Sequence, residues 1–366
     1  MQRIVVKIGS SSLTTREGGL NRKQVDYFAA EIAELIRQGT QVLLVTSGAV
    51  AAGYMSIGYK ERPKILAAKQ ASAAVGQALL MQAYQEAFSR FGLPVAQLLL
   101  TRSDFSNRKR ATNALMTIEV LLQKKAVPII NENDTISVDE LKFGDNDTLS
   151  ALTANLVKAQ HLLIVTDTDG LYSADPRKNA NATRIGQVDE INEAIMRIAG
   201  GAGSAVGTGG MRSKIEAARI AMRGGVPAFV GTAAEPGDLL RALKGQGKGT
   251  YFHTHSETLP MKKQWVGFLS KPQGTIQIDQ GAEKALLFGG KSLLPAGVIA
   301  VTGEFHPGDV VEVQNAQKQT IGRGVSNYAS WQIRAVAGMS LKEAQKRVDA
   351  HPAEVIHRDE WFAFNH

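Results

Sequence analysis

Short β-branched runs alternate with longer helical patterns in the first part of the chain, and this alternation limits the fold more than any other feature. Ile4–Ile8 predicts a strand, Val25–Arg37 a helix and Gln41–Val45 the next strand. The alternation continues with strand candidates at 94–100, 127–130, 161–165 and 227–230 and helix candidates at 64–91, 147–157 and 210–223. We therefore predict an α/β fold, a three-layer αβα sandwich whose mainly parallel sheet is covered on both faces.

The pattern changes after about Gly231, and the length of 366 residues predicts a second domain, because single cores rarely grow past roughly 250–300 residues. From Lys271 onward short strands and turns dominate, with strand candidates at 275–278, 298–302, 310–313 and 321–325. We predict a first domain at 1–255, a linker at 256–271, a small β-rich domain at 272–350 and a C-terminal tail at 351–366.

The composition excludes several classes of protein. Cysteine is absent, which excludes disulfides, zinc–thiolate sites, iron–sulfur clusters and cysteine nucleophiles. The N-terminus runs directly into a strand pattern without an apolar signal region, and no segment approaches the roughly 20 apolar residues that span a bilayer. We expect a soluble, cytoplasmic protein with no membrane partner.

The net charge of +8 lies almost entirely in the first 254 residues, because residues 255–366 hold 12 basic and 11 acidic side chains. A basic protein raises the question of nucleic-acid binding. An excess located in the larger N-terminal part could equally serve a small anionic substrate.

Acidic side chains gather directly after the apolar run at 126–130, which predicts a buried strand. Because like charges repel, water, a metal ion or a cationic ligand must offset the repulsion. Acids and amides at the carboxyl end of a strand lie where open α/β sheets bind ligands. For Asp139 and Glu140 a solvated hairpin is the favoured interpretation. In contrast, we assign four residues of this segment to a binding site: Asn131, Asp134, Asn146 and Asp147.

Several loops could bind an anion. Gly207–Lys214 supplies glycines, a hydroxyl and a lysine where a helix begins, although a flexible surface loop is the alternative. It is not a P-loop, because the required spacing is absent from the chain. Lys7 ends an apolar strand, where a lysine is costly unless it meets an anion; a lysine at an exposed edge is the alternative. Ser47 and Asp167 also follow predicted strands.

Together, two lysines, glycine turns and a nearby acid cluster suit phosphoryl transfer, which depends on positioning and on neutralising charge. Such chemistry typically uses Mg²⁺, which binds oxygen ligands and phosphates. A serine hydrolase is not supported, because G-x-S-x-G is absent and none of the seven histidines has a recognisable triad context.

Six segments in order resemble the glutamate 5-kinase family. They are VVKIGSSSLT at 5–14, VTSGAVAAG at 45–53, INENDT at 130–135, KFGDNDTLSA at 142–151, LLIVTDTDGLY at 162–172 and GTGGMRSK at 207–214. The pairing of NEND with GDND, together with GTGGM, is specific. Residues 272–350 resemble the PUA domain that many members of that family carry.

The resemblance implies an amino-acid kinase fold and phosphorylation of L-glutamate by ATP to L-glutamyl 5-phosphate, the first step of proline biosynthesis. It implies that Lys7 and Lys214 stabilise the transferring phosphoryl group and that Asp147 holds both lysines. The implied glutamate-binding residues are Ser47, Gly48, Ala49, Asn131, Asp134, Asp145 and Asn146. The implied ATP-binding residues are Lys7, Gly9, Ser10, Thr166, Asp167, Thr208, Gly209, Gly210, Met211, Arg212, Ser213 and Lys214. Mg²⁺ would be held mainly by the ATP phosphates.

The resemblance also implies a homo-oligomer (dimer or tetramer), feedback inhibition by proline and a downstream glutamyl phosphate reductase. Two alternatives stay open. Another amino-acid kinase would act on aspartate, N-acetylglutamate or carbamate, but Asp134 as a partner for a free ammonium favours glutamate. An RNA-binding protein would act through the PUA-like domain, but the near-neutral charge of 255–366 argues against it.

Overall fold

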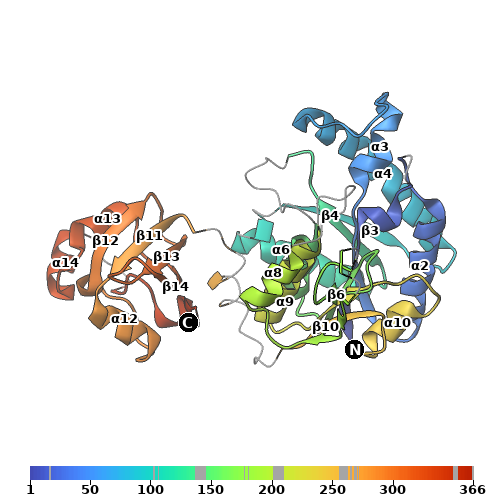
Figure 1. Ribbon diagram of the computed structural model, residues 1–366. Coiled ribbons are helices and arrows are strands. Elements are labelled where there is room, and N and C mark those ends of the chain that lie inside the picture. Colours follow the sequence, from blue (N-terminus) through green and yellow to red (C-terminus); the bar gives the residue numbers. More distant parts are fainter. Residues whose placement is uncertain are drawn as a thin grey trace. The chain divides into compact units, whose positions relative to one another are not determined.

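The computed structural model describes residues 1–15, 18–101, 104–105, 107–136, 146–176, 178–179, 181–200, 210–254, 263, 266–267, 270, 272–348 and 353–364. The chain divides into two compact units, the first made of Met1–Asp104 and Lys109–Thr258 and the second of Phe105–Arg108 and Leu259–His366 (Figure 1). In the parts of the chain listed above, no helix combines the length and apolar character needed to cross a membrane.

In the described part of the first unit, eight strands form one sheet in the order β3-β4-β2-β1-β5-β9-β10-β8. Neighbouring strands from β3 to β9 run parallel, and β10 runs antiparallel to β9. The mainly parallel sheet is therefore confirmed. The strands are β1 (Arg3–Ile8), β2 (Gln41–Val45), β3 (Val95–Leu100), β4 (Val127–Glu132), β5 (His161–Val165), β8 (Gln187–Val188), β9 (Ala228–Gly231) and β10 (Gly249–Phe252). A separate pair consists of β6 (Leu171–Tyr172) and β7 (Arg184–Ile185).

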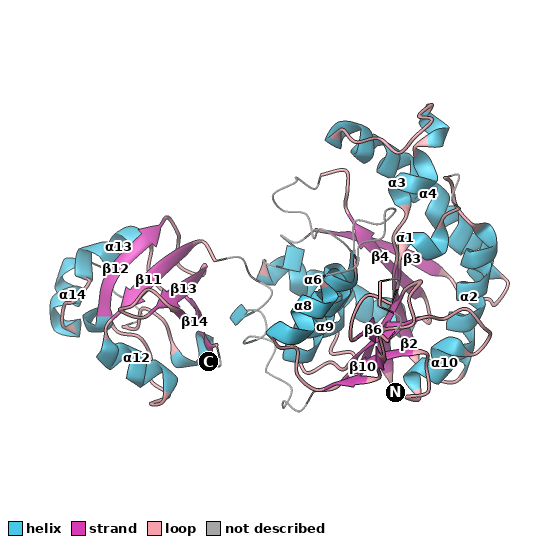
Figure 2. Ribbon diagram, viewed as in Figure 1, coloured by secondary structure: helices cyan, strands magenta, loops and turns pink. Residues whose placement is uncertain are grey.

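Helices cover both faces of this sheet (Figure 2). The described helices of this unit are α1 (Ser10–Leu13), α2 (Arg22–Arg37), α3 (Ala49–Gly53), α4 (Leu66–Ser89), α6 (Arg108–Gln123), α7 (Asn146–Leu156), α8 (Glu193–Ala199), α9 (Met211–Arg223), α10 (Asp238–Leu243) and the 3₁₀ turn η1 (Met55–Ile57). α2, α4 and α10 share one apolar core with β1 and β2. α7 and α9 pack on each other and on the central strands. The predicted helices at 25–37, 64–91, 147–157 and 210–223 thus correspond to α2, α4, α7 and α9.

The second unit has a core of its own around a five-stranded sheet, counted over its described residues, in the order β12-β11-β13-β14-β15. Its strands are β11 (Gly274–Ile278), β12 (Val298–Gly303), β13 (Val310–Gln314), β14 (Thr320–Val325) and β15 (Trp361–Ala363). Its helices are α12 (Gln280–Leu287), α13 (Ser330–Val336) and α14 (Leu341–Arg347), with 3₁₀ turns η4 (Pro295–Gly297) and η5 (Arg358–Glu360). The last strand pairs with β14 and lies within residues 351–366, which were predicted to form a C-terminal tail.

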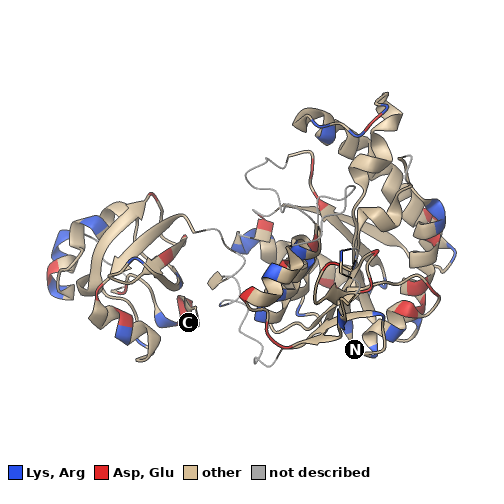
Figure 3. Cartoon of the chain, viewed as in Figure 1, with Lys and Arg blue, Asp and Glu red and all other residues tan. Residues whose placement is uncertain are grey.

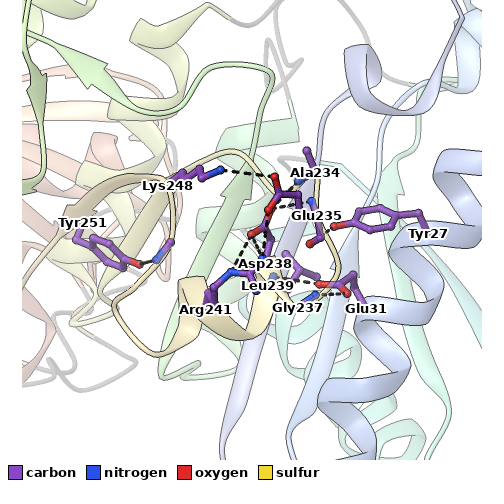
Figure 4. Close-up of polar contacts among 11 residues, drawn as sticks. Tyr27, Glu31, Ala234, Glu235, Gly237, Asp238, Leu239, Arg241, Lys248 and Tyr251 are labelled. Atoms are coloured by element: carbon purple, nitrogen blue, oxygen red, sulfur yellow. Dashed lines mark hydrogen bonds and ion pairs between the residues drawn. The ribbon is translucent and has the colours of Figure 1, made fainter.

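A polar network joins α2 to the segment that follows β9 (Figure 4). The Tyr27 hydroxyl donates to the carbonyl of Glu235 at 2.7 Å. The Glu31 carboxylate accepts from the backbone N–H groups of Gly237 at 2.8 Å and Leu239 at 3.2 Å. Glu31 is buried although it is acidic, so these two bonds replace the water it has lost. The network holds the chain where it leaves β9 and enters α10.

Replacing Glu31 with alanine is expected to lower the free energy of unfolding by about 1–3 kcal/mol, because two backbone donors lose their buried acceptor. Urea unfolding of the variant measures the change. Glu34→Ala on the same helix is the control: Glu34 pairs with Arg37 at the surface, and its removal should leave the unfolding midpoint nearly unchanged. Equal midpoints for both variants would mean that the buried bonds contribute nothing.

Candidate active site

The strand period of two directs Lys7 away from the α2 side of the sheet. Its neighbours Val6 and Ile8 belong to the apolar core that includes α2. Because side chains alternate along a strand, Lys7 points to the opposite face, where α7 and α9 lie. Figure 3 shows that many charged residues of this unit lie on helices and loops. Lys7 is only 4% exposed.

Asp147, in the first turn of α7, is the counter-ion of Lys7. One of its carboxylate oxygens forms an ion pair with the Lys7 ammonium. The other, Oδ2, lies 3.2 Å from the ammonium of Lys214 on α9 and accepts a hydrogen bond from the Ser213 hydroxyl at 2.8 Å. Asp147 is completely buried, and both lysines are nearly so. Three elements far apart in the sequence thus bring two cations and one anion together.

The charges of this cluster do not cancel. Burial by itself would raise the pKa of Asp147, but Lys7 and Lys214, with hydrogen bonds from Lys7 and Ser213, outweigh burial and hold that pKa below its usual range. The carboxylate therefore stays ionised at neutral pH. Among these three described side chains, two ammonium groups meet one carboxylate, and such an excess of positive charge favours the approach of an anion.

Helix α9 directs its N-terminus to the same place. Gly210 is its N-cap residue, and its carbonyl is a second acceptor for the Ser213 hydroxyl at 2.8 Å. The first backbone N–H groups of a helix have no partner within the helix and attract anions. Gly9, at the start of α1, leaves space beside the cluster: a Cβ there would lie 3.6 Å from the Lys7 ammonium. The arrangement suits a phosphate group.

A second group of polar side chains adjoins the first through the sequence neighbours Asn146 and Asp147. The Asn146 amide nitrogen donates to the Thr46 carbonyl at 2.6 Å, to Asn131 Oδ1 at 2.7 Å and to the Ser47 hydroxyl at 3.1 Å. These residues come from the carboxyl ends of β2 and β4, as the position of ligand sites in α/β sheets predicts.

Close helix packing shapes the loop at 46–49. Gly48 has a φ of 98°, which glycine adopts at little cost, and it starts α3 directly after β2. Helix α3 then crosses α4 at glycines: a Cβ on Gly76 would lie 1.8 Å from the Ala49 carbonyl oxygen, and one on Gly53 would lie 2.1 Å from the Ser72 carbonyl oxygen. Larger residues at these positions would push the loop away from α4.

The remaining predicted residues have separate places. Thr166 and Asp167 follow β5, which pairs with β1, and the Thr166 hydroxyl donates to the Asp167 carboxylate at 3.0 Å. Asp134 lies in the turn after β4, and Ser10 begins α1. Met211 and Arg212 form the first turn of α9. The predicted site residues Asp145, Thr208 and Gly209, with Asp139 and Glu140, lie outside the described residues.

Two residues of α4 also support the site and were not singled out in the sequence. Gln77 accepts a hydrogen bond from the Asn131 amide at 2.8 Å. The Tyr84 hydroxyl lies 2.9 Å from that of Thr46, and burial raises the pKa of Tyr84. Both were hidden in an Ala-, Leu- and Gln-rich helical pattern. Their spacing of seven residues, which places both on one helix face, is the only signal that could have found them.

Two protein-family models match this chain. The Amino acid kinase family model matches residues 2–232, and a PUA domain model matches residues 274–348. The fold that carries the two adjoining polar groups is therefore that of an amino acid kinase. The structure of carbamate kinase from Giardia lamblia bound to AMP-PNP resembles this chain in fold, with a TM-score of 0.50 and 19% identity over 69% of this chain and 98% of that one.

Curated relatives narrow the class. Glutamate 5-kinase of Bacillus mycoides (strain KBAB4) is 49% identical over 364 residues, which cover 99% of each chain. Glutamate 5-kinase of Geobacillus kaustophilus (strain HTA426) is 52% identical over 361 residues, which cover 98% of this chain and 96% of that one. The chain belongs to the glutamate 5-kinases of the amino acid kinase family.

Proposed function

We propose that this chain transfers the γ-phosphoryl group of ATP to the γ-carboxylate of L-glutamate and forms L-glutamyl 5-phosphate and ADP, the first step of proline biosynthesis. The observation that carries the proposal is the buried Lys7–Asp147–Lys214 cluster beside Asn146. One half of the site suits phosphates, and the other half suits a small polar acceptor. The similarity to glutamate 5-kinases over nearly the whole chain supports glutamate as that acceptor.

The chemistry requires two anions to approach each other. A γ-carboxylate oxygen attacks the γ-phosphorus, the bond to the bridging oxygen breaks, and that oxygen leaves on ADP. The attacking carboxylate is already ionised, so no strong general base is needed. The two lysines offset the repulsion and stabilise charge on the transferring group. Asp147 contacts both ammonium groups and so keeps the two lysines next to each other, where both can reach the transferring group.

Substrate recognition divides between the two halves. For glutamate, the carboxylate of Asp134 meets the ammonium, and the Ser47 hydroxyl with the loop N–H groups meets a carboxylate. The other glutamate-binding residues in the proposal are Gly48, Ala49, Asn131, Asp145 and Asn146. For ATP, the N-terminus of α9 and Lys214 contact the phosphates. The other ATP-binding residues in the proposal are Lys7, Gly9, Ser10, Thr166, Asp167, Thr208 and Gly209.

Magnesium would neutralise phosphate charge and orient the nucleotide. In the described residues, no group of three or more His, Cys, Asp or Glu side chains could hold a metal ion, and the Asp147 carboxylate is already engaged by two lysines. The protein therefore offers no preformed cage in these parts, and the ion would arrive on the ATP phosphates. We further propose that the chain forms a homo-oligomer in the cytoplasm and is inhibited by proline. Its acyl phosphate product would pass to a reductase.

Trapping the acyl phosphate with hydroxylamine tests this function. The full chain, with ATP and Mg²⁺, is expected to form γ-glutamyl hydroxamate from L-glutamate and to form far less product from aspartate or N-acetylglutamate. Reactions without ATP are the blank. A preference for N-acetylglutamate would mean that the protein is a different amino-acid kinase. If folded protein that binds ATP forms no product with any acceptor, the proposed reaction is wrong.

A further inference from the structure

A row of amide side chains leads from Asn146 into α4. The Asn146 amide nitrogen donates to Asn131 Oδ1 at 2.7 Å, and the Asn131 amide nitrogen donates to Gln77 Oε1 at 2.8 Å. The Gln77 amide nitrogen in turn donates to Gln97 Oε1, also at 2.8 Å. Asn131 and Gln77 are buried, whereas Gln97 on β3 is exposed. The row therefore runs from the half-buried Asn146 at the acceptor side of the site, through two buried amides, to an exposed amide at the surface.

One backbone group sets the direction of the whole row. The N–H of Glu132 donates to Asn131 Oδ1 at 2.9 Å. A backbone N–H can only donate, so the oxygen of the Asn131 amide must face it and the nitrogen must face Gln77. Gln77 then has to present its oxygen to Asn131, and Asn146 has to present its nitrogen. Rotating any one of these amides by half a turn would place two donors or two acceptors against each other.

A second support from α4 reaches Asn146 from the other side. The Thr46 carbonyl, which accepts from the Asn146 amide at 2.6 Å, belongs to a residue whose hydroxyl contacts that of Tyr84. Tyr84 lies seven residues after Gln77, on the same face of α4. The two shortest hydrogen bonds of the Asn146 amide are thus each held by a side chain of α4. The close approach of Gly76 to Ala49 fixes the distance between α4 and this loop.

We propose that Gln77 is a positioning residue for the acceptor site: by accepting from the Asn131 amide it holds Asn131, and through it Asn146, in the orientation that the Glu132 N–H sets, so that Asn146 Oδ1 faces the acceptor and accepts a hydrogen bond from its amino group. The amide nitrogen of Asn146 is occupied by three acceptors from β2 and β4, so its oxygen lies on the opposite edge of the amide. An ammonium has three N–H donors, one for Asp134 and one for Asn146. This inference rests on the proposed function.

The test compares glutamate with glutarate, the same dicarboxylate without the amino group. Gln77→Met keeps the size of the side chain but removes its hydrogen-bonding atoms. It is expected to raise the KM for glutamate about 10-fold, the effect of one buried donor left without an acceptor. The KM for ATP should stay unchanged, and so should the inhibition constant of glutarate. Equal losses for glutamate and glutarate, or no loss for either, would overturn the assignment.

Matched variants separate positioning from general damage. Gln77→Glu keeps an oxygen facing Asn131, and the exposed Gln97 can turn its nitrogen toward the new carboxylate, so the KM for glutamate should return toward the wild-type value. Gln97→Ala should have little effect, because water can replace an exposed acceptor. Gln82→Met makes the primary substitution on an exposed position of α4, where the amide contacts Glu86, and should behave as wild type. Damage in either control, or no recovery with glutamate at position 77, contradicts the proposal.

The outcomes also separate this inference from the proposed function. Wild-type protein that forms no hydroxamate from glutamate removes the function, and this inference with it. Active wild type with unchanged selectivity in Gln77→Met removes only the positioning role. If Gln77→Met does not fold, Gln77→Asn carries the same prediction, because its shorter side chain withdraws the oxygen from Asn131 while it stays polar.

Discussion

Replacing Lys214 with methionine is expected to lower kcat for phosphoryl transfer by about 10²–10³-fold, the loss found when one donor to a transition-state charge is removed. The ammonium of Lys214 is buried on Asp147, at the N-terminus of α9 where the phosphates would lie. The variant should fold, because Asp147 keeps Lys7 as a neutralising partner and methionine fills most of the vacated space. The KM values should change less than kcat if the contact strengthens in the transition state.

Hydroxamate formation under saturating ATP and glutamate measures this change. Lys248→Met is the matched control, since that lysine is largely exposed and lies 3.8 Å from Glu235 in a surface ion pair. It should leave kcat near the wild-type value. Activity of Lys214→Met close to wild type would remove Lys214 from the reaction and leave Lys7 as the remaining candidate cation.

Replacing Asp147 with asparagine is expected to impair both turnover and stability. The substitution leaves two buried ammonium groups without their shared counter-ion, and breaking such a pair costs about 3–5 kcal/mol. Repulsion between them disturbs the positions from which both would contact the transferring phosphoryl group. We therefore expect kcat to fall strongly.

In the wild type, the pH dependence of stability includes a contribution from Asp147. The pKa of Asp147 is lower in the folded protein than its usual value, because the lysines and hydrogen bonds outweigh burial. Its contribution to stability is therefore fully present above the ordinary aspartate pKa of about 3.9, and it is lost only as the pH falls through the lower folded-state pKa. Asp147→Asn should lack this acid-dependent part of the unfolding curve.

Thermal unfolding with and without ATP separates the two effects in Asp147→Asn. Bound phosphates replace the missing anion, so ATP should raise the Tm of the variant more than that of the wild type. Asp238→Asn is the control: it removes another buried carboxylate, which binds backbone N–H groups of Ala234 and Glu235, and should lower the Tm without changing kcat. A pure rise in the KM for ATP, with kcat intact, would contradict the role of Asp147.

Local patterns predicted much of the first unit and less of the second. The strands at 41–45 and 161–165 were placed with their correct ends, because β-branched runs bounded by turn residues are a local signal. Helix α6 and the antiparallel β10 were not predicted, nor were α12, α13 and α14. β15 is a short strand that exists only through its pairing with β14, so its own residues carry little signal.

The amino-acid sequence by itself determined the parallel sheet and the location of the polar loops at the carboxyl ends of its strands. Both follow from the periodicity of apolar residues over short segments, which is a local property and does not depend on tertiary contacts. The contact of Asp147 with Lys7 and Lys214 was implied only by the family resemblance, and the local pattern carried no sign of it. Only the tertiary structure decided that Gln77 reaches Asn131. The sequence does not show whether a glutamine is buried or exposed, and it does not show which carboxylate pairs with a given lysine. Those pairings arise when burial removes water and each charge or amide must find its partner in the assembled core.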